Sequence, residues 1–155
     1  AVASDALQFN LVLGYTDAKF NEVMFYDAVT KTTTDVSGLW SFANTPELTG
    51  TLGTKYTTAL LGGELVFNAN LYHRSETQIF ELPSVLDFGG YTLFNAGATW
   101  YDASGNWDVS LQGRNLGNKE TRIAGYNFPL LAGEQTITAY YGDPRTVSLT
   151  VGYRF

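Results

Sequence analysis

Residues 145–155 read Arg-Thr-Val-Ser-Leu-Thr-Val-Gly-Tyr-Arg-Phe, and apolar and hydrophilic positions alternate along the stretch from Thr146. Successive side chains of a β-strand point to opposite faces, so the alternation predicts a strand with one apolar face and one hydrophilic face. The apolar positions are Val147, Leu149, Val151, Tyr153 and Phe155, and the others are Thr146, Ser148, Thr150, Gly152 and Arg154.

Five other stretches repeat this alternation, at residues 7–16, 48–56, 64–74, 94–100 and 107–114. The chain is therefore predicted to be all-β, an antiparallel meander of about six long strands. Short turns are expected at residues 57–63 and 102–106, and long connections at 21–45, 76–89 and 120–144. Short turns on one side and long loops on the other are typical of outer-membrane barrels, whose short turns lie in the periplasm. Both chain ends are then expected on the periplasmic side.

Composition supports strands over helices. The 155 residues include 10 Phe, 10 Tyr and 16 Gly, with 15% charged residues. Mean hydropathy is -0.08, as expected if each strand shows an apolar side chain at every second position. The net charge of -6 argues against nucleic-acid binding, and the absence of cysteine does not discriminate between compartments. The chain starts with Ala1 and has no leader-like segment, so any export signal is expected upstream.

Aromatic residues gather where the predicted strands meet the short turns. Aromatic rings prefer the interface between lipid and water, so these positions predict a periplasmic aromatic girdle. A strand of about 11 residues, rising about 3.3 Å per residue and tilted by about 40°, crosses about 28 Å, close to the apolar band of about 25 Å in such barrels. The girdle positions are Tyr56, Trp100, Tyr101, Trp107, Tyr153 and Phe155.

Several stretches together resemble the C-terminal end of a TonB-dependent outer-membrane receptor. The resemblance is carried by Tyr91–Gly97, by Gly113–Glu120, and by Tyr141–Thr146 leading into Gly152–Phe155. Upstream, residues 14–20 and 44–47 are similar to earlier strands of the same family, so the likeness covers nearly the whole chain apart from the long loops.

The resemblance implies a bacterial outer-membrane transporter whose 22-stranded barrel surrounds a plug domain. Such receptors import scarce nutrients, among them ferric siderophores, haem, cobalamin and glycans, with energy delivered through TonB. Residues 1–155 correspond to roughly the last six strands, without the plug and the TonB box. The implied partners are outer-membrane lipid, the remaining barrel strands and plug, the TonB complex through the missing N-terminal part, and the barrel-assembly machinery. Neither the imported substrate nor the oligomeric state follows from the sequence.

Six strands cannot close a barrel, because known bacterial barrels have at least about 8. Each open edge in lipid leaves backbone groups without partners, at several kcal/mol for each group. The isolated chain is therefore expected to aggregate or to need detergent.

Candidate site residues fall into three groups, and no catalytic residues, cofactor or metal site are predicted. Loop aromatics and one arginine are suited to capturing a ligand, although they also suit packing among themselves. Polar strand residues are expected to line the lumen, where they face a solute pathway, the plug or only water. The last strand is expected by family analogy to be the assembly signal. The predicted ligand-capture residues are Trp40, Phe42, Arg122, Tyr126, Tyr140 and Tyr141. The predicted lumen residues are Asn68, Asn70, Gln112 and Arg114, and the predicted assembly signal comprises Val151, Tyr153 and Phe155.

Other conspicuous residues have simpler interpretations. His73 is the single histidine and is read as a residue at the strand rim, since one histidine makes no metal site. Asp102 and Asp108 flank a turn and are read as turn residues. Gly62-Gly63 is read as a hairpin turn, and Asp143-Pro144-Arg145 as the turn before the last strand.

Two alternatives to the transporter segment remain open. One is a small stand-alone barrel or an oligomeric pore, in which several chains complete the wall. The other is a soluble glycan-binding β-sandwich, in which the apolar faces would pack against each other.

Overall fold

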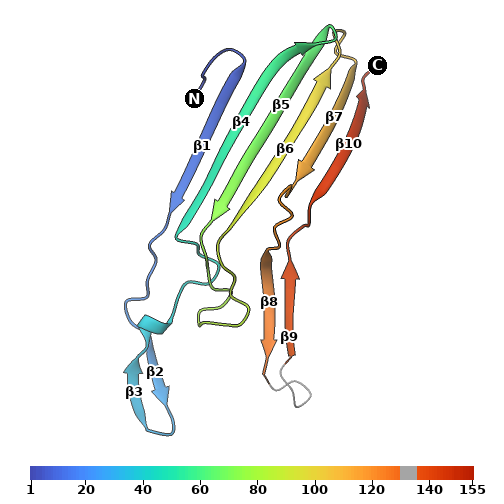
Figure 1. Cartoon of the computed structure of the whole chain (residues 1–155). Helices are drawn as coiled ribbons and strands as arrows, with labels where there is room; N and C mark the ends of the chain where they lie inside the picture. Colours follow the sequence, from blue (N-terminus) through green and yellow to red (C-terminus); the bar gives the residue numbers. More distant parts are fainter. Residues whose placement is uncertain (130–135) are drawn as a thin grey trace.

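The computed structural model describes residues 1–129 and 136–155, and its main element is a six-stranded antiparallel sheet in the order β1-β4-β5-β6-β7-β10. The order of these strands in the sheet is the same as their order along the chain (Figure 1). The predicted all-β meander is therefore confirmed. The strands are β1 (Leu7–Tyr15), β4 (Leu48–Leu60), β5 (Gly63–Arg74), β6 (Tyr91–Tyr101), β7 (Trp107–Arg114) and β10 (Thr146–Tyr153).

Two long connections contain secondary structure that the alternation did not predict. The first forms the hairpin β2 (Met24–Asp27) and β3 (Thr32–Asp35), followed by the 3-10 turn η1 (Ser37–Leu39). The other forms the hairpin β8 (Arg122–Phe128) and β9 (Thr136–Tyr141). In residues 1–129 and 136–155, no helix has the length and apolar character needed to cross a membrane.

Short and long connections lie at opposite ends of the sheet. The β4–β5 and β6–β7 turns share one end with both chain termini, and the two small hairpins project from the other end (Figure 1). The prediction that both termini lie at the same end of the sheet as the short turns is therefore confirmed (Figure 1). Below, the ends of the sheet are named the turn end and the loop end.

The β4–β5 turn lies one residue earlier than predicted. Leu61 and Gly62 have φ values of 52° and 77°, whereas Gly63 already belongs to β5. Two successive residues with positive φ are typical of the type I′ turn, whose twist matches that of the adjoining strands. Gly63 has a different role, because a Cβ atom there would overlap the carbonyl oxygen of Tyr101 on β6.

Strand register keeps the alternation in phase across the whole sheet. Leu11 pairs with Leu52, Leu52 with Leu71, and Leu71 with Phe94, so their side chains form one apolar row. Further rows run through Leu111 and its partners Ala98 and Leu149, and through Val109 and its partners Trp100 and Val151. All rows lie on one face of the sheet, and the hydrophilic positions share the other.

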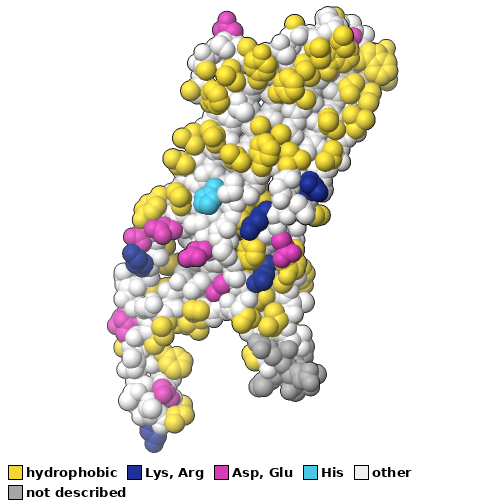
Figure 2. Space-filling model, in the orientation of Figure 1, with side chains coloured by type: hydrophobic (Ala, Val, Ile, Leu, Met, Phe, Trp, Pro, Cys, Tyr) yellow, Lys and Arg dark blue, Asp and Glu magenta, His cyan; other side chains and the backbone are white. Residues whose placement is uncertain are grey.

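Within residues 1–129 and 136–155, no second layer packs over this apolar face. Leu11, Leu13 and Leu149 are 63%, 67% and 68% exposed. Hydrophobic side chains cover much of the strand region in the view of Figure 2. Among the described residues, the buried hydrophobic side chains are Ile79 and Leu86, and both belong to the β5–β6 loop rather than to the sheet.

The small core at the loop end holds the β5–β6 loop against β8. Leu86 is 2% exposed and lies over Gly125, where an added Cβ atom would come within 2.8 Å of Leu86 Cδ1. Arg122 donates to the carbonyl oxygen of Val85 at 3.2 Å, and its guanidinium lies 5.3 Å from the centre of the Phe88 ring. These contacts give the loop end defined structure of its own.

Candidate functional site

The four predicted lumen residues lie on the hydrophilic face of the sheet. Asn68 and Gln112 both pair with Gly97, from β5 and β7. Asn70 lies two residues further along β5, where its Oδ1 accepts a 2.8 Å hydrogen bond from Asn95 Nδ2. Arg114 shares this face because it lies two residues beyond Gln112. The register thus places all four on one face of the sheet, and their role as lumen residues stays a prediction.

Glycines beneath this face let long polar side chains lie flat on the sheet. A Cβ atom at Gly53 would overlap the Asn10 amide, and one at Gly97 would overlap Gln112. Gly53 and Lys55 are among the residues that line a shallow hollow of about 460 Å³ on this face. The hydrophilic face is thus an open surface of amides, hydroxyls and charges, which suits contact with water or a polar solute.

Asn115 joins three segments at the loop end of this face. It is 5% exposed, and its Nδ2 donates to the carbonyl oxygens of Lys119 at 2.8 Å and Asp143 at 3.0 Å. Its Oδ1 accepts from the Lys119 N–H at 2.8 Å, and its own N–H donates to Asn95 Oδ1 at 2.8 Å. One side chain thereby fixes the end of β7, the following turn and the approach to β10.

The predicted loop aromatics Trp40 and Phe42 come together around a third ring, that of Phe20. Phe20 and Phe42 are stacked, with ring centres 4.2 Å apart and planes 6° apart. Trp40 meets Phe20 edge to face at 6.2 Å and 88°. These three residues are named the aromatic cluster below, and they line a cavity of about 640 Å³.

The other predicted ligand residues lie on a separate projection. Tyr126 of β8 and Tyr140 of β9 meet edge to face at 6.2 Å, and both are more than half exposed. Tyr141 lies beside Tyr140 on β9 and is 50% exposed. The β2–β3 and β8–β9 hairpins point down from opposite sides of the sheet with open space between them (Figures 1 and 2). The six candidates therefore form two groups, not one site, and Arg122 is held by the β5–β6 loop.

The three predicted assembly-signal residues share the apolar face of the last strand and the residues after it. Val151 pairs with Val109, and the Tyr153 ring lies 4.6 Å from that of Trp107. Phe155 lies beyond the end of β10, with its ring centre 6.0 Å from that of Tyr153, and its side chain is fully exposed. Of the six predicted girdle positions, Trp107, Tyr153 and Phe155 form a group of rings near the turn end, whereas Tyr101 pairs with Glu64 and Asp108 on the hydrophilic face.

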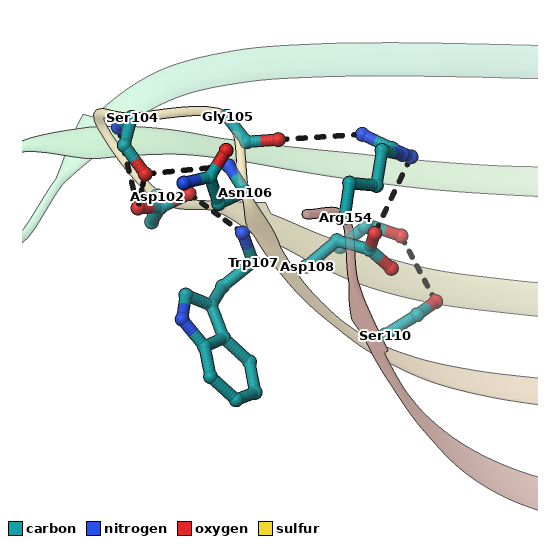
Figure 3. Close-up of polar contacts among 9 residues, drawn as sticks. Asp102, Ser104, Gly105, Asn106, Trp107, Asp108, Ser110 and Arg154 are labelled. Carbon is teal, nitrogen blue, oxygen red and sulfur yellow. Dashed lines mark hydrogen bonds and ion pairs between the residues drawn. The ribbon is translucent and has the colours of Figure 1, made fainter.

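On the opposite face, Arg154 holds the end of β10 to the β6–β7 turn (Figure 3). Its guanidinium lies 3.4 Å from Asp108 Oδ1 and donates to the Gly105 carbonyl oxygen at 3.5 Å. Gly152 permits this approach, since a Cβ atom there would lie 2.6 Å from Asp108 Oδ1. The arginine is 69% exposed, so the ion pair orients the strand end and adds little stability.

Asp102 organises the β6–β7 turn in the same view (Figure 3). Oδ2 accepts hydrogen bonds from the hydroxyl and the N–H of Ser104, and Oδ1 accepts from the Trp107 N–H at 2.8 Å. Bonds from Ser104 and Trp107 stabilise the ionised carboxylate, so the pKa of Asp102 lies below its ordinary value of 3.8. The prediction that Asp102 is a turn residue is confirmed.

The lowered pKa of Asp102 gives a pH dependence with a defined sign. The unfolded chain takes up the proton first, so the stabilisation is complete above about pH 4 and is lost as the pH falls through the folded-state pKa. In urea unfolding, Asp102→Asn should lower the midpoint at pH 6 more than at pH 3. Ser104→Ala, which removes the largest cause of the shift, should reduce the same pH dependence. An equal loss at both pH values would contradict this account.

His73 lies in phase with the apolar positions of β5, near its loop end. Its Nδ1 is 2.9 Å from Thr92 Oγ1 on β6. Across residues 1–129 and 136–155, no group of three or more histidine, aspartate or glutamate side chains is placed to hold a metal ion. The hydrogen bond to Thr92 suits the interpretation of His73 as a residue at the strand rim.

The sequence patterns predict no site role for Phe20 or Asn115. Phe20 meets Phe42 only through tertiary folding of two loop segments, so no local pattern indicated it. Asn115 and Asn118 have φ values of 47° and 49°, in the left-handed region that asparagine tolerates. The sequence Asn-Leu-Gly-Asn at residues 115–118 is a local indication of this turn.

Comparisons with protein-family models, with curated proteins and with solved structures found no match for this chain.

Proposed function

We propose that this chain is the C-terminal part of the β-barrel of a TonB-dependent outer-membrane transporter. It supplies a section of wall, a polar lumen surface and surface loops for the uptake of a scarce nutrient such as a ferric siderophore, haem, cobalamin or a glycan. The observation that carries the proposal is a single-layered meander whose apolar face is uncovered across all six strands.

An uncovered apolar face of this extent is costly in water. Burying a large aliphatic side chain stabilises a protein by about 1.5–3 kcal/mol, and here whole rows of such side chains stay outside any core. Contact with lipid removes this cost. The strands β4, β5 and β6 have 13, 12 and 11 residues, enough to cross the apolar band of about 25 Å when tilted.

The sheet edges support a larger closed structure. Within the described residues, β1 and β10 are the edge strands of the main sheet. The free edge of β1 already carries an antiparallel bridge between Val2 and Gln8, and the Phe9 N–H donates to the Ala1 carbonyl oxygen at 2.7 Å. A strand continuing from this bridge would satisfy the β1 edge, as closure of a barrel in lipid requires.

Copies of this chain could also satisfy the edges, in an oligomeric pore. This second hypothesis, an oligomeric pore, is based on the same edges of β1 and β10, but its activity would not depend on TonB. A soluble glycan-binding sandwich receives less support, because no second sheet packs on the apolar face among the described residues.

Surface labelling of intact cells tests the proposed topology. An epitope inserted after Val29, which is 91% exposed between β2 and β3, should be accessible to antibody outside the cell. The same epitope after Gly105 in the β6–β7 turn should react only after the outer membrane is permeabilised. Uptake of the nutrient should also disappear in cells without TonB. Equal access to both epitopes, or TonB-independent uptake, would refute the proposal.

A further inference from the structure

A cavity of the loop end, lined in part by the aromatic cluster, lies between the segment that follows β1 and the segment around η1. It measures about 640 Å³, within the range of about 300–1,000 Å³ usual for small-molecule sites. A second cavity of about 550 Å³ adjoins it and shares Ser41, Phe42, Thr45 and Glu47 as lining residues. The two cavities meet at these four residues, and together they are named the groove below.

The aromatic cluster supplies a flat wall to this groove. Phe20 and Phe42 are parallel and cover each other's inner faces, whereas Phe42 is still 41% exposed. A flat exposed ring suits stacking of the apolar C–H face of a sugar ring. A cage for a quaternary ammonium ion requires several free ring faces converging on one point, and a stacked pair does not provide them.

The polar lining is acidic and rich in acceptors. Asp17 and Glu47 line the first cavity, and Glu76 and Asp87 line the second, where the Asp87 carboxylate already accepts from the Ile79 and Ser84 N–H groups. Lys19 is the cation of the first cavity, and it lies 2.9 Å from Asp17 Oδ1. Carboxylate oxygens accept hydrogen bonds from hydroxyl groups, whereas they repel carboxylates and negatively charged iron complexes.

We infer that this groove binds an uncharged oligosaccharide, with one sugar ring stacked on the aromatic cluster and its hydroxyl groups donating to Glu47 and the neighbouring acids. The inference rests on the proposed function in one respect, that the loop end faces the outside of the cell. It narrows the nutrient to a neutral glycan and excludes anionic ferric siderophores and haem at this groove.

Binding is tested with the complete detergent-purified protein that carries this chain. The probes are maltotriose, cellotriose, xylotriose and triacetylchitotriose, with a ferric tris-catecholate complex and choline as charged comparisons. At least one trisaccharide should give saturable heat in titration calorimetry and a saturable change in tryptophan fluorescence that is lost in Trp40→Phe. Binding of no trisaccharide, or of the ferric complex alone, would overturn the inference.

Variants separate the sugar site from a general effect on folding. Trp40→Ala should weaken the trisaccharide by about tenfold, equal to about 1.4 kcal/mol. Glu47→Gln keeps the side-chain shape and should weaken it roughly threefold, because the amide oxygen still accepts the hydrogen bond but as a neutral acceptor. Phe25→Ala on β2, an exposed ring outside the groove, is the matched control and should leave affinity unchanged. Tighter binding of a trisaccharide to Glu47→Gln would contradict the inference, because it would show that the Glu47 carboxylate does not accept from the sugar hydroxyl groups.

These outcomes are distinguishable from failure of the proposed function. Surface-exposed loops and TonB-dependent uptake of a ferric complex, without trisaccharide binding, would leave the transporter proposal standing and refute the sugar site. Trisaccharide binding by a protein whose two epitopes are equally accessible would support the sugar site and refute the transporter proposal.

Discussion

Replacing Leu52 with arginine is expected to prevent most of the protein from assembling in the outer membrane. Leu52 lies within an apolar row of the sheet, between Leu11 and Leu71, and is 47% exposed. An arginine on the lipid face near the middle of a barrel wall costs about 2–4 kcal/mol. The amount of folded protein in purified outer membranes, read from its resistance to unfolding in cold detergent, is the measurement.

Thr51→Arg is the matched control for this substitution. Thr51 is the preceding residue on β4, and it pairs with Val12 and Tyr72 on the hydrophilic face, which already carries Lys55. The same charge one residue away should therefore have little effect on yield. Equal losses from the two variants would show that the faces do not differ in environment, and the assignment of the apolar face to lipid would fail.

Asn115→Ala is expected to destabilise the folded protein by about 3 kcal/mol. Three side-chain hydrogen bonds of a residue that is 5% exposed disappear, at about 1 kcal/mol each, and the buried partner groups are left without them. Alanine also tolerates the φ of 47° less well than asparagine does. Urea unfolding of the detergent-solubilised protein, followed by tryptophan fluorescence, measures the loss.

Two further variants divide this loss into its causes. Asn115→Gly removes the same hydrogen bonds but accepts a positive φ, so it should recover about 1 kcal/mol relative to Asn115→Ala. Asn68→Ala, an exposed amide on the same face, should cost less than about 0.5 kcal/mol. If the Asn68 and Asn115 variants lose similar stability, Asn115 does not join the three segments as described.

The six long strands were predictable because their pattern has the period of the structure itself. Residues 146–153, for example, alternate at every position, and the register with β7 preserves that alternation. The β2–β3 hairpin escaped prediction because Met24, Phe25 and Tyr26 are apolar in succession and its strands have four residues each. Its turn did carry a local sign, since Asp27 Oδ1 accepts from the Val29 N–H at 2.8 Å, a common role of aspartate in turns.

The candidate site was predictable only in its residue types. Aromatic residues in long loops indicated ligand capture, yet which of them meet depends on how the loops fold. Phe20 joins Phe42 across 22 positions of sequence, whereas Tyr126 and Tyr140 pair within a separate hairpin. The face of the sheet on which a residue lies was easier to predict. Strand periodicity places Asn68, Asn70 and Gln112 on the face opposite the apolar positions of their own strands.

Tryptophan quenching by brominated lipids tests most directly whether the apolar face meets lipid. Two single-tryptophan variants are compared in vesicles whose lipids are brominated close to the head group, one keeping Trp107 and one keeping Trp40. Trp107 is 47% exposed on the apolar face near the turn end, whereas Trp40 belongs to the loop cavity. We expect Trp107 to lose roughly half of its fluorescence and Trp40 to keep nearly all of it, since interfacial rings lie within reach of the bromines. Unquenched Trp107 in correctly folded protein would contradict the account.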